Sequence, residues 1–339
     1  MTRIALFGAT GFIGAACAAA LAGAGHEVLP RPARRLWVDG EALTPAPQRA
    51  YRPHLAGLAA ELDGVGAVVN AAGVAMSAAR LSPGLVGGNA AWPRLLADAC
   101  EQTGVPRLVH VSTAAVQGRS ARLDESLRYA PVTPYARSKT LGEQLLRDAA
   151  AGGRVEVTLY RPPSVHGPGR RMTSAFAAFC QRWPLVTCGD GNQPVPVALI
   201  GNIGAAVAAI LAADSAPLVV SHPYEGHTVR TLYETFAPGR PLRTLPTRVV
   251  RGLLRAAEPS GQWLPPLSAL CRRAELLLFG QGQEPGWLEA RGFRLPLGQP
   301  AWDEVAAAVH RRSPPGDRPA HGAGGSPLRH ADGHTSDNH

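Results

Sequence analysis

Short apolar runs alternate with segments of helical pattern through the first half of the chain. Buried strands are predicted at residues 4–7, 28–29, 67–73, 108–111 and 155–159. Helices are predicted at residues 12–24, 55–62, 89–100 and 134–150, the third of them opened by Asn89. Strands that alternate with helices in this way are typical of an α/β fold with a doubly wound parallel sheet.

The alternation weakens beyond residue 165, where a helix at 203–211 and a strand at 218–220 are expected. We expect residues 165–312 to form mainly a smaller cap over the carboxyl edge of the sheet, with some elements returning to it. At 247–257 a basic amphipathic helix is predicted, which could touch a membrane or an anionic substrate. A solvated Arg face over an apolar core contact is the favoured interpretation of that helix. Residues 313–339 are rich in Pro, Gly, Ser, Asp and His, which predicts a disordered tail.

Composition narrows the class of protein. No apolar run is long enough to span a bilayer, and the start of the chain lacks the pattern of a signal peptide, so no membrane partner and a cytoplasmic location are expected. The five cysteines are scattered, which argues against a disulfide framework and a structural zinc site, and no metal site is predicted. The net charge of +9 is spread along the chain, which favours phosphate-bearing small molecules over a nucleic-acid partner.

A glycine-rich turn joins the first strand to the first helix. Its sequence is Gly8-Ala9-Thr10-Gly11-Phe12-Ile13-Gly14. Glycines at such a junction allow a tight turn and let a pyrophosphate approach the amino end of the helix. Because the strand and the helix are both present, we interpret the motif as a dinucleotide-binding turn, and residues 1–164 as mainly a dinucleotide-binding Rossmann domain.

Basic residues follow the second strand, where a site that prefers NAD would carry an acidic residue. Arg31 stands there, and Arg34 and Arg35 come shortly after it. A guanidinium at this place can pair with a 2′-phosphate, so NADP is predicted as the cofactor, with NAD as the alternative. A solvated basic turn would explain the same residues without a cofactor.

The segment Tyr135-Ala136-Arg137-Ser138-Lys139 contains the only lysine among the 34 Lys and Arg residues. Thr133 and Pro134 are suited to the N-cap and first position of a helix, which would put Tyr135 and Lys139 on one face. An ammonium near a phenol favours the phenolate and lowers the pKa of the tyrosine. Taken alone, the pair could equally be surface residues of an amphipathic helix.

Together these motifs resemble the extended short-chain dehydrogenase/reductase family, of the NAD(P)-dependent epimerase/dehydratase type, over residues 3–310. The residues that carry the resemblance are the glycine turn, Asn70-Ala71-Ala72-Gly73, Asn89, Ser112-Thr113, Tyr135 with Lys139, and His166-Gly167-Pro168-Gly169. The resemblance implies a Rossmann sheet with a smaller C-terminal substrate-binding cap. It also allows a homodimer, since members of the family are often dimers.

The family implies a catalytic set of Thr113, Tyr135 and Lys139, with Ser112 as the second choice for its first member. Tyr135 would exchange the proton with the substrate, Lys139 would hold the nicotinamide ribose, and Thr113 would hydrogen-bond the reacting oxygen. The cofactor contacts expected from the family are Gly8, Thr10, Gly11, Phe12, Ile13, Gly14, Arg31, Arg35, Ala71, Ala72, Asn89, Tyr135, Lys139 and Pro162.

Several residues depart from the family pattern. Ala114 and Ala115 replace the acidic pair of the sugar dehydratases, which argues against dehydration. Ser164 and His166 replace the Asn and Tyr that are usual in enzymes of nucleotide sugars; His166 could contact substrate or pack within its loop. The leading hypothesis is an NADP-dependent ketoreductase that acts on a small biosynthetic intermediate such as a nucleotide-linked keto-sugar. An NAD-dependent nucleotide-sugar epimerase and a non-catalytic NAD(P)-sensing protein are the alternatives.

Overall fold

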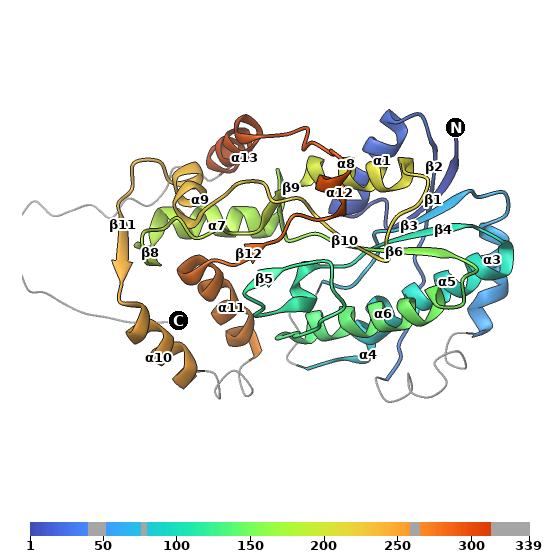
Figure 1. Ribbon diagram of the computed structural model, residues 1–339, viewed down its shortest axis with the longest axis horizontal. Helices are drawn as coiled ribbons and strands as arrows, with labels where there is room; N and C mark the ends of the chain where they lie inside the picture. Colours follow the sequence, from blue (N-terminus) through green and yellow to red (C-terminus); the bar gives the residue numbers. More distant parts are fainter. Residues whose placement is uncertain (40–51, 76–79, 258–264, 313–339) are drawn as a thin grey trace, which may run out of the picture.

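The computed structural model describes residues 1–39, 52–75, 80–257 and 265–312 (Figure 1). Its main sheet has six parallel strands in the order β10-β6-β4-β3-β1-β2. These strands are β1 (Arg3–Phe7), β2 (Glu27–Arg31), β3 (Ala67–Asn70), β4 (Arg107–Val111), β6 (Glu156–Arg161) and β10 (Val219–Ser221). The predicted parallel α/β sheet is thereby confirmed.

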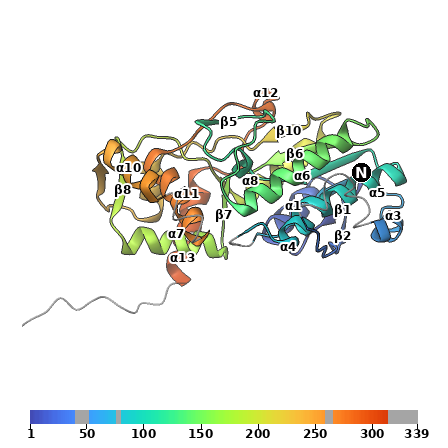
Figure 2. The same ribbon diagram turned by 90° about the horizontal axis from the view of Figure 1, so that it is seen from below.

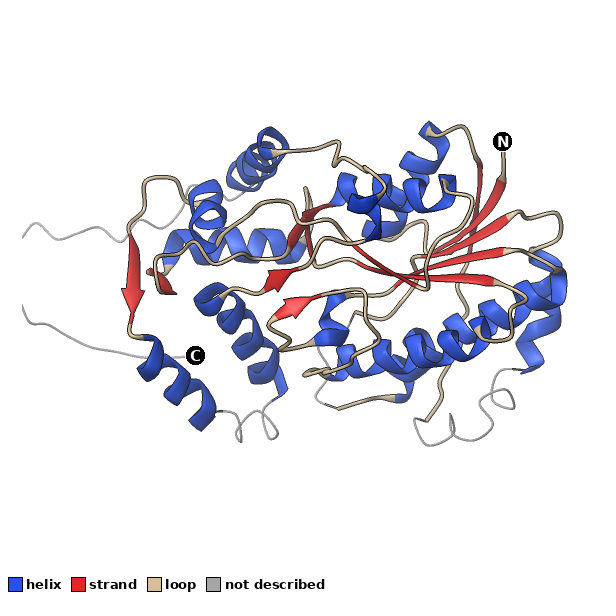
Figure 3. Cartoon of the chain, viewed as in Figure 1, coloured by secondary structure: helices blue, strands red, loops and turns tan. Residues whose placement is uncertain are grey.

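Helices cover both faces of this sheet (Figures 1 and 3). On one face lie α3 (Leu55–Glu61), α5 (Trp92–Thr103) and α6 (Pro134–Ala150), and on the other lie α1 (Phe12–Gly23), α8 (Ile200–Ala212) and α12 (Trp287–Ala290). Side chains along a strand alternate between the two faces. Thus Ala5 and Phe7 of β1 pack into the core with α5, whereas Ile4 and Leu6 pack into the core with α1 and α8. Burial on both faces explains the continuous apolar runs in the central strands β1 and β3.

The order of the strands reverses between β1 and β3. The chain leaves β1 toward β2 on one side and later continues through β3, β4 and β6 on the other. In open parallel sheets, ligands bind in the crevice beyond the carboxyl ends of the strands at such a reversal. The glycine turn that follows β1 and the small residues that follow β3 both lie at this crevice.

Most of the remaining elements lie beyond the carboxyl ends of the central strands (Figures 1 and 2). The helices α7 (Arg171–Arg182), α9 (Val229–Phe236) and α13 (Gln299–Arg312) share a third apolar core. Three short parallel pairs are β5 (Arg122–Leu123) with β12 (Gly282–Gln283), β7 (Ser164–His166) with β9 (Val197–Leu199), and β8 (Leu185–Cys188) with β11 (Leu242–Leu245). The helices α10 (Thr247–Ala257) and α11 (Pro265–Phe279) complete this part. Among the described residues, no helix is long and apolar enough to cross a membrane.

The helix around Asn89 begins earlier than the sequence predicts. It starts as α4 (Pro83–Val86), whose N-cap Ser82 accepts a hydrogen bond from the Leu85 amide at 3.3 Å, and passes through a π-helical turn at Gly87–Ala91 before α5. Asn89 therefore lies inside a helix, and the prediction that it opens one is wrong. The predicted tail at 313–339 lies outside the described residues.

Candidate active site

The glycine turn brings β1, β3 and α1 into contact through backbone atoms. Gly8 has φ of +84°, and a Cβ placed there would lie 2.7 Å from the Ala72 amide nitrogen. A Cβ on Gly14 would lie 2.0 Å from the Gly8 carbonyl oxygen. Side chains are thus excluded at both positions, and the amino end of α1, with Gly11 as N-cap, faces the crevice with no side-chain cap. This cradle fits a pyrophosphate bound through backbone N–H groups.

The arginine that ends β2 and the two that follow the strand differ in what they contact. Arg34 forms an ion pair with Glu61. Arg31 is partly buried, and its hydrogen bonds to described residues are both long, from Nε to the Glu61 carbonyl at 3.5 Å and from Nη1 to the Pro30 carbonyl at 3.4 Å. Arg35 is exposed. The hydrogen bonds of the Arg31 guanidinium are therefore weak, and a phosphate could replace them with little loss of interaction energy.

Two buried asparagines shape the loop after β3. Asn70 accepts hydrogen bonds from the Ala72 amide at 3.1 Å and from Trp92 Nε1 at 3.2 Å. Asn89 bonds both the amide and the carbonyl of Val74, each at 2.9 Å, and donates to Ser138 Oγ at 2.9 Å. Its amide group thus ties this loop to α6. A direct contact between Asn89 and a cofactor stays a prediction.

Tyr135 and Thr113 face one another at the carboxyl end of β4. Thr133 caps α6 as predicted, accepting a hydrogen bond from the Ala136 amide at 3.1 Å, and this sets Tyr135 in the first turn. Burial raises the pKa of Tyr135 above its usual value, while the Arg170 charge and a hydrogen bond with Thr113 act to lower it. The phenol is therefore protonated at neutral pH. The sequence analysis assigned the charge effect to Lys139, whereas in the structure Arg170 supplies it.

Lys139 is buried one turn further along α6. Its Nζ donates to the Val111 carbonyl at 3.0 Å, and a Cβ on Gly73 would lie only 3.2 Å from Nζ. Burial lowers the pKa of Lys139 to about 8, and the nearby Glu143 charge acts in the opposite direction. An ammonium held at this crevice suits a ribose hydroxyl.

Ser112 and Thr113 are adjacent in sequence but make different contacts. The Ser112 hydroxyl donates to Glu143 at 2.5 Å, within the buried interior. Thr113 is partly exposed, and its hydroxyl accepts from the Ala115 amide at 3.2 Å while lying beside Tyr135. These contacts favour Thr113 as the group next to a reacting oxygen and give Ser112 a structural role.

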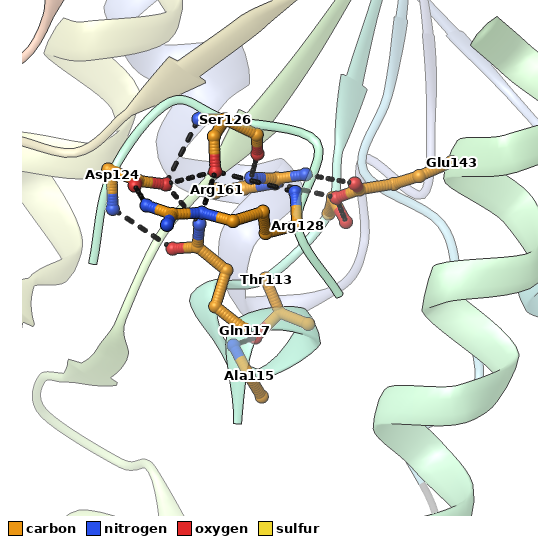
Figure 4. A network of polar contacts seen from close by, with 9 residues as sticks. Thr113, Ala115, Gln117, Asp124, Ser126, Arg128, Glu143 and Arg161 are labelled. Atoms are coloured by element: carbon orange, nitrogen blue, oxygen red, sulfur yellow. Dashed lines mark hydrogen bonds and ion pairs between the residues drawn. The ribbon is translucent and has the colours of Figure 1, made fainter. Parts of the chain in front are cut away.

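A buried ion pair connects α6 to the end of β6 (Figure 4). Arg161 donates to Glu143 from Nε at 3.0 Å and from Nη2 at 2.6 Å, and both side chains are almost fully buried. Arg161 Nη1 also donates to the Ser126 carbonyl at 2.7 Å. Such a bidentate pair needs both partners, because either charge alone would be buried without compensation.

The loop beyond β5 is held by a second polar cluster in the same view (Figure 4). Asp124 accepts hydrogen bonds from Gln117 Nε2 at 2.5 Å and from Ser126 Oγ at 2.6 Å, and it also pairs with Arg128. Burial would raise the pKa of Asp124, but the bonds from Ser126, Arg128 and Gln117 hold it well below its usual range. The loop carrying Ser126 is thus fixed beside Arg161.

A cavity of about 330 Å³ opens at the crevice. Thr113 and Tyr135 line it, as do Ile13 of the glycine turn and the predicted cofactor contact Pro162. Further lining residues are Ser164, Arg170, Met172, Arg272, Arg273 and Leu276. The structure therefore brings the tyrosine, the threonine and the glycine turn to one cavity, with Lys139 buried next to it.

His166 packs inside the protein. Its ring lies 5.5 Å from that of Trp302 and 6.0 Å from that of Phe176, and burial lowers its pKa to about 3. Of the two interpretations of His166, contact with substrate and packing within its loop, the second fits this buried environment.

Three charged residues of this region were missed by the sequence analysis. Glu143 lies four residues after Lys139, so helical spacing could have placed it on the same face. Arg161 and Arg170 carry no local signal, because their partners Glu143 and Phe12 are distant in sequence.

Comparisons with known proteins identify the family and related folds. The sequence profile of the "NAD dependent epimerase/dehydratase family" matches residues 4–220. The chain is 27% identical over 121 residues to the "Uncharacterized UDP-glucose epimerase YtcB" of Bacillus subtilis, a match covering 34% of this chain and 38% of that protein. It is 38% identical over 74 residues to the UDP-glucose 4-epimerase of Azospirillum brasilense, covering 21% of each chain. These matches therefore span well under half of either relative.

Among solved structures, the UDP-glucuronic acid 4-epimerase from Bacillus cereus in complex with NAD has a similar fold, with a TM-score of 0.62. Its sequence identity to this chain is 16%, and the match covers 91% of this chain and 99% of that one. The likeness extends beyond the sheet into the C-terminal part.

Proposed function

The chain belongs to the NAD dependent epimerase/dehydratase family and is an enzyme of the extended short-chain dehydrogenase/reductase type, and we propose that it is an NADP-dependent reductase of a ketone. The observation that carries this proposal is the placement of the Tyr135 hydroxyl beside Thr113 in a cavity next to the glycine turn, where burial raises its pKa. A phenol that keeps its proton at neutral pH is suited to donate it to a carbonyl oxygen.

Each of these residues would have its own role in the reaction. Thr113 and Tyr135 would hydrogen-bond the carbonyl oxygen, and Tyr135 Oη would transfer its proton to that oxygen as the alcohol forms. Arg170 would stabilise the phenolate that remains, and Lys139 would hold the nicotinamide ribose. A bound reduced nicotinamide supplies hydride to the carbonyl carbon. The cradle around Gly8 and Gly14 would hold the pyrophosphate.

An NAD-dependent nucleotide-sugar epimerase is the second candidate. It is favoured by the identity to UDP-glucose epimerases over part of the chain and by the NAD bound in the structure with a similar fold. Mass spectrometry of the cofactor that co-purifies distinguishes the two. Stoichiometric NAD that resists removal would support the epimerase, and an empty protein that prefers NADPH would support the reductase.

The choice of NADP depends on Arg31. We expect Arg31→Ala to raise the Kd for NADPH by about 10- to 100-fold, because a charge-assisted bond to the 2′-phosphate is lost, and to leave the Kd for NADH within about twofold. Titrations of both cofactors measure this. Arg154→Ala, which removes an exposed arginine elsewhere, is the matched control. Equal affinity of the parent protein for the two cofactors, unchanged by Arg31→Ala, would refute the NADP assignment.

Cofactor affinity should also depend on pH through Lys139. Below about pH 8 its side chain is an ammonium that can donate to a ribose, and above that pH the charge is lost. We therefore expect the Kd for the cofactor to rise as the pH increases above about 8, by at most about tenfold per pH unit. Titrations from about pH 6.5 to about pH 9.5 test this.

Glu143→Gln provides a check on that assignment. Because the Glu143 charge raises the pKa of Lys139, the variant should lose affinity at a lower pH than the parent. A Kd that stays constant across the pH range would show that Lys139 does not hold the cofactor by its charge.

A further inference from the structure

The cavity is lined by three arginines, Arg170, Arg272 and Arg273, and by no carboxylate among the described residues. The described charged side chains that line the proposed substrate site are therefore all positive. A cavity whose charged groups are all of one sign concentrates ligands of the other sign.

The three arginines differ in whether protein groups already satisfy them. Arg272 is engaged, since it donates to the Gly118 carbonyl at 2.6 Å and to Gln281 at 2.9 Å and pairs with Glu275. Arg273 is exposed at the rim of the cavity. Arg170 is partly buried, and within the described part of the chain its contact is the ring of Phe12, 4.7 Å from the guanidinium carbon.

Arg170 is thus a partly buried cation with no carboxylate bound to it in the described residues. Taking a charge out of water is unfavourable unless an ion pair or hydrogen bonds compensate. Burial lowers the pKa of Arg170 in accordance with this. An anion that reached Arg170 would also lie near Tyr135, because the Arg170 charge acts on that phenol.

Much of the remaining wall is apolar. It includes Ala114, Ala115, Leu123, Val132, Met172 and Leu276. Some polar side chains of the wall already form hydrogen bonds with other protein groups. The Ser112 hydroxyl donates to Glu143. The Gln281 amide nitrogen donates to the Gly118 and Ser120 carbonyls. Sugar hydroxyls placed against such a wall would lose hydrogen bonds to water without replacement.

We propose that the substrate is a carbonyl compound with an apolar body and an anionic group close to the carbonyl, and that Arg170 is the residue that selects this anion. The proposal rests on the proposed reductase function and adds the class of substrate. A carboxylate and a phosphate present the same chemistry to a guanidinium, and both can accept two hydrogen bonds from it.

The test is a panel of aliphatic ketones offered with NADPH in three matched forms, namely keto acids, their methyl esters and the corresponding keto phosphates. We expect kcat/KM for an anionic form to exceed that for the ester by about tenfold or more. Arg170→Gln should remove most of this preference and bring the ratio close to one, and Arg170→Lys should lower it less. Arg171→Gln, which alters an exposed neighbour outside the cavity wall, should leave the ratio unchanged.

The outcomes separate this inference from the proposed reaction. Turnover of ketones with no preference for the anionic form, or with a preference unchanged in Arg170→Gln, would overturn the inference and leave the reductase standing. A loss of NADPH affinity in Arg170→Gln with the ratio intact would also overturn it, since Arg170 would then serve the cofactor. If no ketone were reduced, the reductase would fail, but binding of a saturated fatty acid and not its amide, lost in Arg170→Gln, would still support Arg170 as the residue that selects the anion.

Discussion

Tyr135→Phe is expected to lower kcat by about 10²- to 10⁴-fold, because the variant keeps the ring but lacks the hydroxyl that transfers the proton. The phenol carries its proton at neutral pH in this structure, since burial raises its pKa. The substituted ring retains the apolar contacts of the cavity wall. Turnover of the best ketone with saturating NADPH is the measurement.

Two controls make the result specific to the hydroxyl. The Kd for NADPH should change by less than about threefold, because the glycine turn and Lys139 are untouched. Tyr224→Phe removes a hydroxyl that bonds the His227 carbonyl away from the cavity, and it should leave kcat within about twofold. Full activity of Tyr135→Phe would refute the catalytic assignment.

Glu143→Ala is expected to lower the free energy of unfolding by about 3–5 kcal/mol, because it leaves Arg161 charged and buried without its partner. The substitution also removes the acceptor of the Ser112 hydroxyl. Urea denaturation followed by circular dichroism measures the loss. Because domains are stable by only about 5–15 kcal/mol, this would be a large fraction of the total.

Glu101→Ala is the matched control, since Glu101 pairs with Arg154 at the surface, where the Arg154 side chain is 73% exposed. Exposed pairs contribute about 0–1 kcal/mol, so this variant should remain close to the parent. Glu143→Leu combined with Arg161→Met should recover part of the lost stability, because no unpaired charge remains buried. Equal losses in Glu143→Ala and Glu101→Ala would contradict the role given to the buried pair.

The sequence alone determined the elements that rest on local interactions. The turn from β1 into α1 follows from its glycines, because a Cβ at Gly8 or Gly14 would clash with backbone atoms. The start of α6 follows from Thr133 and Pro134, whose effects reach only three residues along the chain. Hydrophobic patterning located the six central strands, because burial on both faces demands continuous apolar runs. Helical spacing likewise placed Tyr135 and Lys139 on one helix.

Only the tertiary structure decided which distant groups meet. The partner of Glu143 is Arg161 on β6, and the cation that acts on Tyr135 is Arg170 beyond β7. The pairing of β8 with β11 likewise joins segments more than fifty residues apart in sequence. Periodicity reports which face of an element is buried but not what it packs against, since contacts between distant segments depend on how the whole chain closes.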